Sequence, residues 1–247
     1  MLTAQLPHQR VKPALPSFEA VEAAAIGNSG IVMGDRVRRF VDLSTIGPTN
    51  AKRLAHRMLQ ANITYIDSPI SGTPAEAENG SLTIVTACAN NDFEAVQPVL
   101  GKLGRVFHVG QSAGLAQTMI LVRAMIRASE MFIHSEAVAM SAQSGLAASL
   151  MFPFIDHGSK PVPPDRLAIS ILTNKLDPDI TLAMLRKNLR FAVEEVEALE
   201  FPEPVASAVV GLWEIAAGKL GSDCYVTSLM RLIEGLSDVT LVGNEKS

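Results

Sequence analysis

The sequence predicts an α/β domain with a mainly parallel β-sheet, followed by a domain made only of helices. In the first half of the chain, short apolar runs alternate with stretches of helical spacing, which is typical of βαβ units. After Gly110 the short apolar runs stop and long helical stretches follow. This change predicts two domains, residues 1–111 and residues 112–247, as the length of 247 residues allows.

The apolar runs of the first half have the length of β-strands. A helix is expected between the first two runs because Leu54, Ala55, Met58 and Leu59 recur at helical spacing. The expected strands are Phe40–Thr45, Thr64–Pro69, Ser81–Ala87 and Arg105–Gly110, and the expected helices between them are Pro48–Ala61 and Phe93–Leu103.

The second half begins with a long predicted helix. Ala113–Ser144 holds no proline and one glycine, so a single helix of roughly thirty residues and about 45 Å is expected. Gly145 is placed to end it. Further on, Asp156–Arg166 is expected to be a proline-rich loop, and three more helices are expected at Asp179–Leu199, Pro204–Lys219 and Val226–Ser237.

The composition excludes several classes of protein. Hydrophobic residues make up 48% and charged residues 19% of the chain, which predicts a packed core rather than disorder. A net charge of −4 gives no basic surface for nucleic acid. Cys88 and Cys224 form no Cys-x-x-Cys pair, the five histidines show no metal-ligand spacing, and the N-terminus has no signal-peptide core. A cytoplasmic protein with a small-molecule substrate is expected.

Two long apolar stretches are relevant to membrane association and to oligomerisation. The uncharged run Ala137–Ile155 approaches the length of a membrane span, but Gln143 and Pro153 within it favour a broken, buried helix. No membrane association is therefore expected. The predicted helix Ala113–Ser144 carries apolar residues almost all round, which predicts a homodimer or a higher homo-oligomer because such a surface is rarely left in water.

Ser44 and Thr45 are candidate ligand-binding residues. They end a predicted strand just before a predicted helix, at the carboxyl edge of the sheet, where open α/β folds bind ligands. Their hydroxyls suit a ribose or a carboxamide. The alternative is an ordinary helix cap, because serine and threonine favour that position.

Ser71, Gly72 and Thr73 are a second candidate group, because they follow a predicted strand and a proline. A glycine there lets backbone amides approach a carboxylate closely, and the hydroxyls add donors. The alternative is a plain turn with no ligand.

Three segments of the chain share the pattern of a known family. Val41–Ala55 (VDLSTIGPTNAKRLA) has the form Asp-x-Ser-Thr-x-x-Pro, and Ile66–Val85 (IDSPISGTPAEAENGSLTIV) is similar to Asp-x-Pro-Val-Ser-Gly-Gly and the glycine after it. Arg186–Val205 (RKNLRFAVEEVEALEFPEPV) is similar to a Lys-Asp-Leu helix followed by proline. Together, in this order, they resemble the 3-hydroxyisobutyrate dehydrogenase (β-hydroxyacid dehydrogenase) family, which includes relatives of 6-phosphogluconate dehydrogenase.

The resemblance implies a partial Rossmann domain, an all-α 6-phosphogluconate-dehydrogenase-like C-terminal domain, and NAD or NADP as cofactor. The reaction implied is hydride transfer on a small hydroxy acid or an imine-like substrate. Thr73 stands where the family has a second glycine, and Asn188 where it has an aspartate. Lys187 matches a lysine that faces the nicotinamide, with a solvated surface lysine as the alternative. The implied cofactor residues are Leu15, Pro16, Ser44, Thr45 and Lys187, and the implied substrate residues are Ser71, Gly72 and Thr73.

Two family features have no counterpart in the sequence. No window reads Gly-x-Gly-x-x-Gly, the turn that holds a pyrophosphate at a helix N-terminus. Because Leu15-Pro16 matches the loop after the family's fourth strand, the first half of the Rossmann domain, about sixty residues, is expected to lie before Met1. The family's catalytic lysine and asparagine are replaced by Thr118 and Val122.

These replacements leave two functions open. A lysine with a lowered pKa suits proton removal from an alcohol during hydride transfer, and neither Thr118 nor Val122 titrates. His108 and His134 are expected to be structural. The leading expectation is an NAD(P)-dependent dehydrogenase or reductase with impaired or altered activity. The alternative is a non-catalytic remnant or a regulatory dimerisation protein of the same fold.

Overall fold

The computed structural model describes residues 5–6, 9–12, 14–34, 36–146, 150, 181–200 and 204–237. The predicted proline-rich loop at 156–166 lies outside the described residues. The chain forms two compact units. The first comprises Met1–Ala124 and Asn188–Pro202, and the second comprises Met125–Lys187 and Glu203–Ser247. The helices α5 (Leu115–Gln143) and α8 (Leu182–Ala198) each contribute residues to both units.

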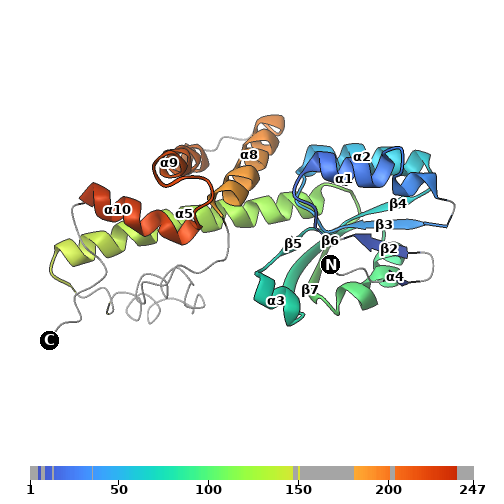
Figure 1. The fold of residues 1–247 in the computed structure, drawn as a ribbon, viewed down its shortest axis with the longest axis horizontal. Coiled ribbons are helices and arrows are strands. Elements are labelled where there is room, and N and C mark those ends of the chain that lie inside the picture. The colour runs from blue at the N-terminus through green and yellow to red at the C-terminus, as the bar shows by residue number, and fades with distance from the viewer. Residues whose placement is uncertain are drawn as a thin grey trace. The chain divides into compact units, whose positions relative to one another are not determined.

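The first unit is built on one seven-stranded sheet (Figure 1). Its spatial order is β1-β2-β3-β4-β6-β5, and β7 pairs with β6. The strands are β1 (Gln5–Leu6), β2 (Gln9–Lys12), β3 (Arg39–Asp42), β4 (Thr64–Asp67), β5 (Ile70–Ser71), β6 (Leu82–Ala87) and β7 (Gly104–Gly110).

The sheet is mixed rather than mainly parallel. Strands β2, β3 and β4 run parallel, as do β6 and β7, whereas β1 with β2, β4 with β6 and β5 with β6 are antiparallel. The connection before β6, residues 68–81, holds β5 and the five-residue helix α3 (Pro74–Glu78). It therefore lacks the full helix that a parallel crossover usually contains. The predicted α/β class is confirmed in this mixed form.

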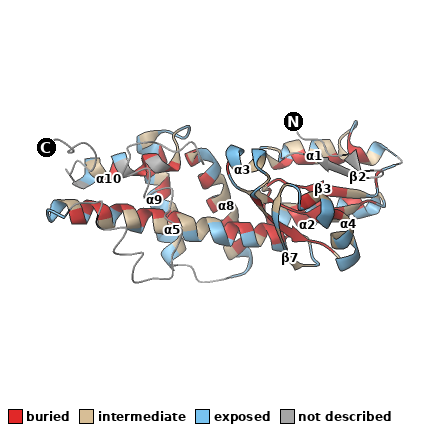
Figure 2. Ribbon diagram, turned by 90° about the horizontal axis from the view of Figure 1, so that it is seen from below, coloured by how far each residue is buried: buried red, intermediate tan, exposed pale blue. Residues whose placement is uncertain are grey.

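Alternating side chains of the strands build two cores, one on each face of the sheet. Phe40 of β3 and Tyr65 of β4 pack with the helices α1 (Phe18–Ile26) and α2 (Pro48–Gln60). Their neighbours Val41 and Ile66 point to the other face, whose cluster includes Val96 of α4 (Asn90–Leu100). Successive residues of a strand point to opposite faces, so two covered faces explain why the central residues of β3 and β4 are apolar on both sides. Figure 2 shows buried positions along the strands and at intervals along α5.

The described part of the second unit is helical. It contains the C-terminal part of α5, α9 (Pro204–Leu220), the 3-10 helix η2 (Val226–Ser228) and α10 (Leu229–Ser237). Its core includes the fully buried Trp213, whose indole donates to the carbonyl of Ala128 at 3.2 Å and meets the Phe132 ring edge-on. The predicted all-α domain is confirmed here, since the described residues of this unit hold only one isolated bridge, Thr181 to Tyr225.

The long predicted helix ends as the sequence indicated. Gly145 adopts φ +82° and donates to the carbonyl of Ala142, and Leu146 donates to that of Ser141 at 2.9 Å. This pair of bonds is the Schellman arrangement, which needs a left-handed residue and therefore favours glycine. Within the described part of the chain, no helix has the length and apolar character needed to cross a membrane.

Candidate functional site

Two aspartates lie side by side where parallel strands end. Asp42 closes β3 and Asp67 closes β4, and the two are register partners in the sheet. Both are buried, with exposed fractions of 2% and 0%. Asp42 accepts hydrogen bonds from the amide of Ser44 at 2.9 Å and from the hydroxyl of Tyr65 at 3.0 Å. Asp67 accepts one from the amide of Gly114 at 2.8 Å. This carboxyl edge is where α/β sheets bind ligands.

Burial changes the ionisation of these groups. Loss of hydration raises the pKa of Asp67 to about 6, opposed by its hydrogen bonds and reinforced by the charge of Asp42. Desolvation also raises the pKa of Asp42. The pKa of Tyr65 is raised because its hydroxyl is desolvated and lies beside the two aspartates. The edge therefore contains two carboxyls that resist ionisation more than aspartates in water do.

Gln117 of α5 connects the two strand ends. Its Nε2 donates to Asp67 Oδ1 at 2.7 Å and to the carbonyl of Ser44 at 3.1 Å. Its Oε1 accepts from the amides of Ile46 and Gly47 at 2.9 and 3.1 Å. The side chain has no exposed surface and fills its capacity of two donors and two acceptor positions. This amide fixes the β3–α2 loop against β4 and the first turn of α5.

The structure brings together several of the predicted cofactor residues. Leu15 and Pro16 form the loop between β2 and α1, at the carboxyl end of β2. The Leu15 amide donates to Ser44 Oγ at 2.9 Å. Thr45 follows Ser44 and is half-buried, whereas Pro16 is exposed. The helix-cap alternative is wrong for Ser44 and Thr45, because Gly47 occupies the N-cap of α2.

The chain just before the predicted substrate residues is bonded to the end of β3. Ser68 donates its amide to the carbonyl of Asp42 at 2.9 Å, and Ile70 donates to that of Leu43 at 3.3 Å. These bonds hold the residues before Ser71 against the end of β3. Ser71 itself is half-buried and pairs with Thr83 of β6.

Gly72 and Thr73 start α3. Gly72 has φ +148°, and a Cβ there would lie 2.6 Å from Leu82 Cδ2, so the position requires glycine. Thr73 is the N-cap of α3 and forms a capping box with Glu76. Its hydroxyl accepts from the Glu76 amide and donates to the Glu76 carboxylate. The segment thus starts a helix and is not a plain turn, and the Thr73 hydroxyl is engaged in the cap. Its role in binding a substrate stays a prediction.

Thr118 and Val122 stand at the family's lysine and asparagine positions, and Thr118 is half-buried whereas Val122 is exposed. The hydroxyl of Thr118 is 3.0 Å from the carbonyl of Gly114, the residue just before α5. It is also 3.5 Å from Oε1 of Glu195 on α8. Glu195 is 9% exposed and belongs to the first unit. Val122 is 45% exposed.

Lys187 belongs to the second unit, so its place relative to Thr45 and Ser71 stays a prediction. It is half-buried, and desolvation lowers the pKa of its ammonium group. The next residue, Asn188, belongs to the first unit, and its buried Oδ1 has no hydrogen-bond partner in the described part of the chain.

Sequence reasoning did not identify four residues of this region as functional. Asp42 and Asp67 stood inside the quoted family segments, and each follows a buried strand, which was the available signal. Gln117 is a polar residue within an apolar stretch of a predicted helix, and such a residue usually needs buried partners. Glu195 is one of several glutamates on its helix, and no sequence pattern singles it out.

The chemistry of this edge fits one end of a dinucleotide. The β2–α1 loop and the Thr45 hydroxyl lie at the carboxyl ends of neighbouring parallel strands, which suits a nicotinamide and its ribose. The sequence contains no Gly-x-Gly-x-x-Gly, so the residues present do not include the usual pyrophosphate turn. Among the described residues, no group of three or more His, Cys, Asp or Glu side chains is placed to hold a metal ion.

Comparison with known families covers nearly all of the chain. Residues 3–110 match the family described as the NAD binding domain of 6-phosphogluconate dehydrogenase. Residues 114–233 match the one described as the NAD-binding domain of NADP-dependent 3-hydroxyisobutyrate dehydrogenase. The two matches follow each other in the order of the two predicted domains.

Individual relatives are distant. The L-threonate dehydrogenase of Pectobacterium atrosepticum is 24% identical over 177 residues, which is 70% of this chain and 58% of the relative. The 2-(hydroxymethyl)glutarate dehydrogenase of Eubacterium barkeri is 24% identical over 236 residues, covering 94% of this chain and 78% of the relative. The chain thus spans little more than half of the first relative's length.

A solved structure agrees on the fold. Mycobacterium tuberculosis 3-hydroxyisobutyrate dehydrogenase, determined with L-serine, superimposes with a TM-score of 0.77 at 21% identity, over 89% of this chain and 77% of that one. Oxidoreductases that use NAD or NADP are therefore its relatives in sequence and in fold. The chain belongs to the 3-hydroxyisobutyrate dehydrogenase and 6-phosphogluconate dehydrogenase-like family of NAD-binding proteins.

Proposed function

We propose that this protein is an NAD(P)-dependent oxidoreductase acting on a small hydroxy acid or an imine-like substrate. The observation that carries the proposal is the hydrogen-bond network at the carboxyl edge of the sheet in the first unit. There, Leu15, Ser44 and the buried side chain of Gln117 join three loops by hydrogen bonds of 2.9–3.1 Å. A site that must hold a ring within a few tenths of an ångström needs such a rigid support.

The residues of this edge have different roles in the proposal. Leu15 and Pro16 pack against the cofactor, and Thr45 offers it a hydroxyl. Lys187 of the second unit remains a predicted cofactor residue. A bound dinucleotide supplies the nicotinamide that gives or accepts hydride. The chain itself supplies the fixed support for Thr45, because Gln117 holds the two residues that follow it, Ile46 and Gly47.

The substrate segment contributes geometry more than charge. Gly72 is held at φ +148°, which leaves the backbone of Ser71 and Gly72 accessible to a substrate carboxylate. Thr73 fixes the direction of this segment by starting α3. Because Thr118 does not titrate near neutrality, oxidation of an alcohol would need a base from elsewhere. The proposal therefore favours reduction, or a substrate that needs no such base.

Titration of the whole chain with NADH or NADPH, followed by the fluorescence of the reduced cofactor, tests the proposal. We expect saturable binding that Thr45→Glu weakens at least about tenfold, since a carboxylate beside the cofactor costs at least one unit of log affinity. The matched control is Thr64→Glu. Thr64 is also half-buried but begins β4, at the opposite edge of the sheet, and we expect a change of less than about twofold.

The second candidate function is a non-catalytic or regulatory protein of the same fold. The observation that favours it is Thr118, whose hydroxyl lies within hydrogen-bonding distance of a carbonyl of its own helix where the family has its lysine. The same titration separates the two candidates. Absence of NADH and NADPH binding in a folded chain would reject the enzyme and favour the second function.

A further inference from the structure

Glu195 is a buried carboxyl without a described cationic partner. It lies on the part of α8 that belongs to the first unit, and only 9% of it is exposed. Its one side-chain hydrogen bond in the described part of the chain is with Thr118 Oγ1, at 3.5 Å, and no lysine or arginine described there forms an ion pair with it. A carboxylate removed from water is costly unless it is paired.

Thr118 is a poor hydrogen-bond donor to Glu195. A threonine hydroxyl has one proton to donate, and the carbonyl of Gly114 is the nearer acceptor, at 3.0 Å against 3.5 Å for Glu195 Oε1. When that proton goes to Gly114, the lone pairs of Oγ1 remain on the side of Glu195. Two acceptors then face each other, and a donor between them would bind both.

Asn188 gives a second observation on the same helix. Its Oδ1 is buried and has no hydrogen-bond partner among the residues that the structure describes. Asn188 and Glu195 are seven residues apart in α8, so they lie on one face of the helix, about 10 Å apart along its axis. The face thus offers two acceptors, an amide oxygen without a donor among the described residues and a carboxylate whose one described side-chain donor, Thr118 Oγ1, is 3.5 Å away.

The charge near Thr118 is the reverse of the charge that the family pattern has at this position. The position that carries lysine in the resemblance carries a neutral threonine here, and a buried carboxylate lies beside it. A substrate that is purely anionic would be repelled by Glu195. A ligand with a positively charged nitrogen would pair with it and donate to both acceptors.

We propose that Glu195, together with Thr118, binds a cationic nitrogen of the substrate, either an amine or a protonated imine. The inference rests on the proposed function, because it names the substrate class of that same site. Glu195 holds the N–H group by a charge-assisted hydrogen bond, and Thr118 Oγ1 accepts a second one. Asn188 Oδ1 is a further acceptor for a longer substrate.

The test uses two ring compounds of the same size, pyrrolidine, which is cationic at pH 7.5, and the uncharged tetrahydrofuran. Binding to the whole chain is measured by ligand-observed NMR, with and without NADPH. We expect pyrrolidinium to bind and tetrahydrofuran to bind at least tenfold more weakly. Glu195→Gln, which keeps the shape and removes the charge, should weaken pyrrolidinium binding at least tenfold.

Glu194→Gln is the matched control, because Glu194 is the adjacent residue and is exposed; we expect less than a twofold change. Thr118→Lys is a second variant in case Glu195→Gln does not fold, since its ammonium group would occupy the place of the ligand nitrogen and abolish pyrrolidinium binding. Equal binding of the two ring compounds, or undiminished pyrrolidinium binding in either Glu195→Gln or Thr118→Lys, would overturn the proposal.

The two proposals fail in different ways. NADPH binding without any Glu195-dependent preference for pyrrolidinium would support the proposed oxidoreductase function and reject the proposed role of Glu195. Glu195-dependent binding of pyrrolidinium without NADPH binding supports the cation site and rejects the oxidoreductase. Loss of both rejects both.

Discussion

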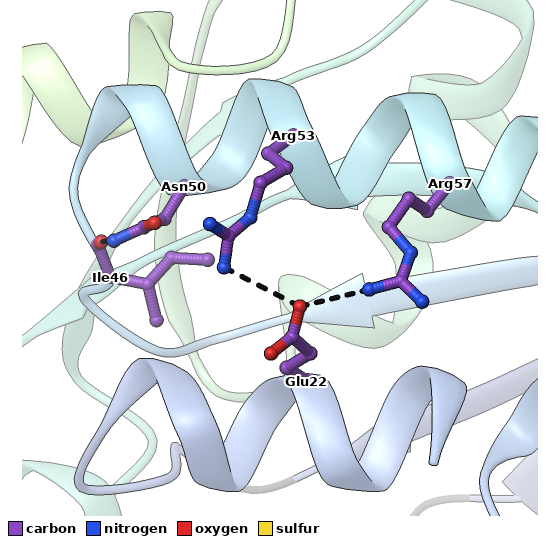
Figure 3. Close-up of polar contacts among 5 residues, drawn as sticks. All are labelled: Glu22, Ile46, Asn50, Arg53 and Arg57. Carbon is purple, nitrogen blue, oxygen red and sulfur yellow. Dashed lines mark hydrogen bonds and ion pairs between the residues drawn. The ribbon is translucent and has the colours of Figure 1, made fainter.

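Two polar clusters of the first unit connect segments that are far apart in the sequence, but they do so in different surroundings. The sheet-edge cluster comprises Asp67, Gln117 and their hydrogen-bond partners, and both of these side chains are fully buried. The helix-surface cluster comprises Glu22 of α1 and the two arginines of α2, Arg53 and Arg57. Figure 3 shows Glu22 between the arginines.

The two clusters differ in burial and also in the number of their bonds: in the described part of the chain Gln117 makes four side-chain hydrogen bonds, whereas Glu22 accepts two. Glu22 Oε1 accepts from Arg57 at 3.0 Å and from Arg53 at 3.4 Å, and the two arginine side chains are about half exposed. Water can replace these bonds when the helices separate. No water replaces the bonds of Gln117 inside the folded protein, so a lost partner there leaves groups unsatisfied. The sheet-edge cluster should therefore fix geometry, and the helix-surface cluster should add little.

Gln117→Ala should have the largest effect. It removes the partner of Asp67 Oδ1 and of the amides of Ile46 and Gly47, each a buried group whose loss of a partner costs about 1–3 kcal/mol. Because water can enter the space left, we expect the free energy of unfolding to fall by about 4 kcal/mol. Urea denaturation followed by circular dichroism measures it. Gln143→Ala, at the exposed end of the same helix, is the control and should change stability by less than about 0.5 kcal/mol.

The contrast also explains what the sequence could predict. Strands β3, β4, β6 and β7 were expected within three residues of their ends because each contains an apolar run, which in β3, β4 and β6 follows from burial on both faces. Strand β2 was not expected, because the segment Gln9–Lys12 is polar apart from Val11 and has no apolar run. Helix α1 was also missed, since its alanine-rich sequence has no clear apolar stripe.

The candidate site could be predicted only in part. Ser44 and Ser71 follow strands, and strand order alone places such residues at a sheet edge. The role of Thr73 does not follow from its place in the family pattern, because Thr73 and Glu76 form a capping box that starts α3. Glu195 meets Thr118 across a separation of 77 residues, and no local pattern specifies such a contact.

The second prediction concerns the pH dependence of the sheet-edge cluster. The pKa of Asp67 is about 6 in the folded protein against 3.8 for the free side chain, so the folded state binds the proton more tightly. This group should therefore stabilise the fold by roughly 2 kcal/mol as pH falls from 7 to 4, out of a full contribution of about 3 kcal/mol at 1.36 kcal/mol per pKa unit. The contribution is complete below pH 3.8 and is lost as pH rises through 6.

Asp67→Asn isolates this contribution from the other carboxyls. The variant cannot titrate at position 67, so the difference in unfolding free energy between the wild-type protein and the variant should grow in favour of the wild type as pH is lowered. Urea denaturation at half-unit pH steps measures this difference. A difference that stays flat between pH 7 and pH 4 would show that burial does not hold the proton on Asp67.

The smallest effect is expected at the helix-surface cluster. Glu22→Gln removes the charge that Arg53 and Arg57 share, and exposed ion pairs contribute about 0–1 kcal/mol. We expect a loss below about 1 kcal/mol that shrinks at 1 M salt, where charges are screened within about 3 Å. Glu94→Gln, on the exposed side of α4, is the control. The cation–π contact of Arg53 with Phe18 remains in the variant, so α1 should stay in place. A loss as large as that of Gln117→Ala would mean that the arginines hold α1 in position, and that burial alone does not rank the polar contacts of this unit.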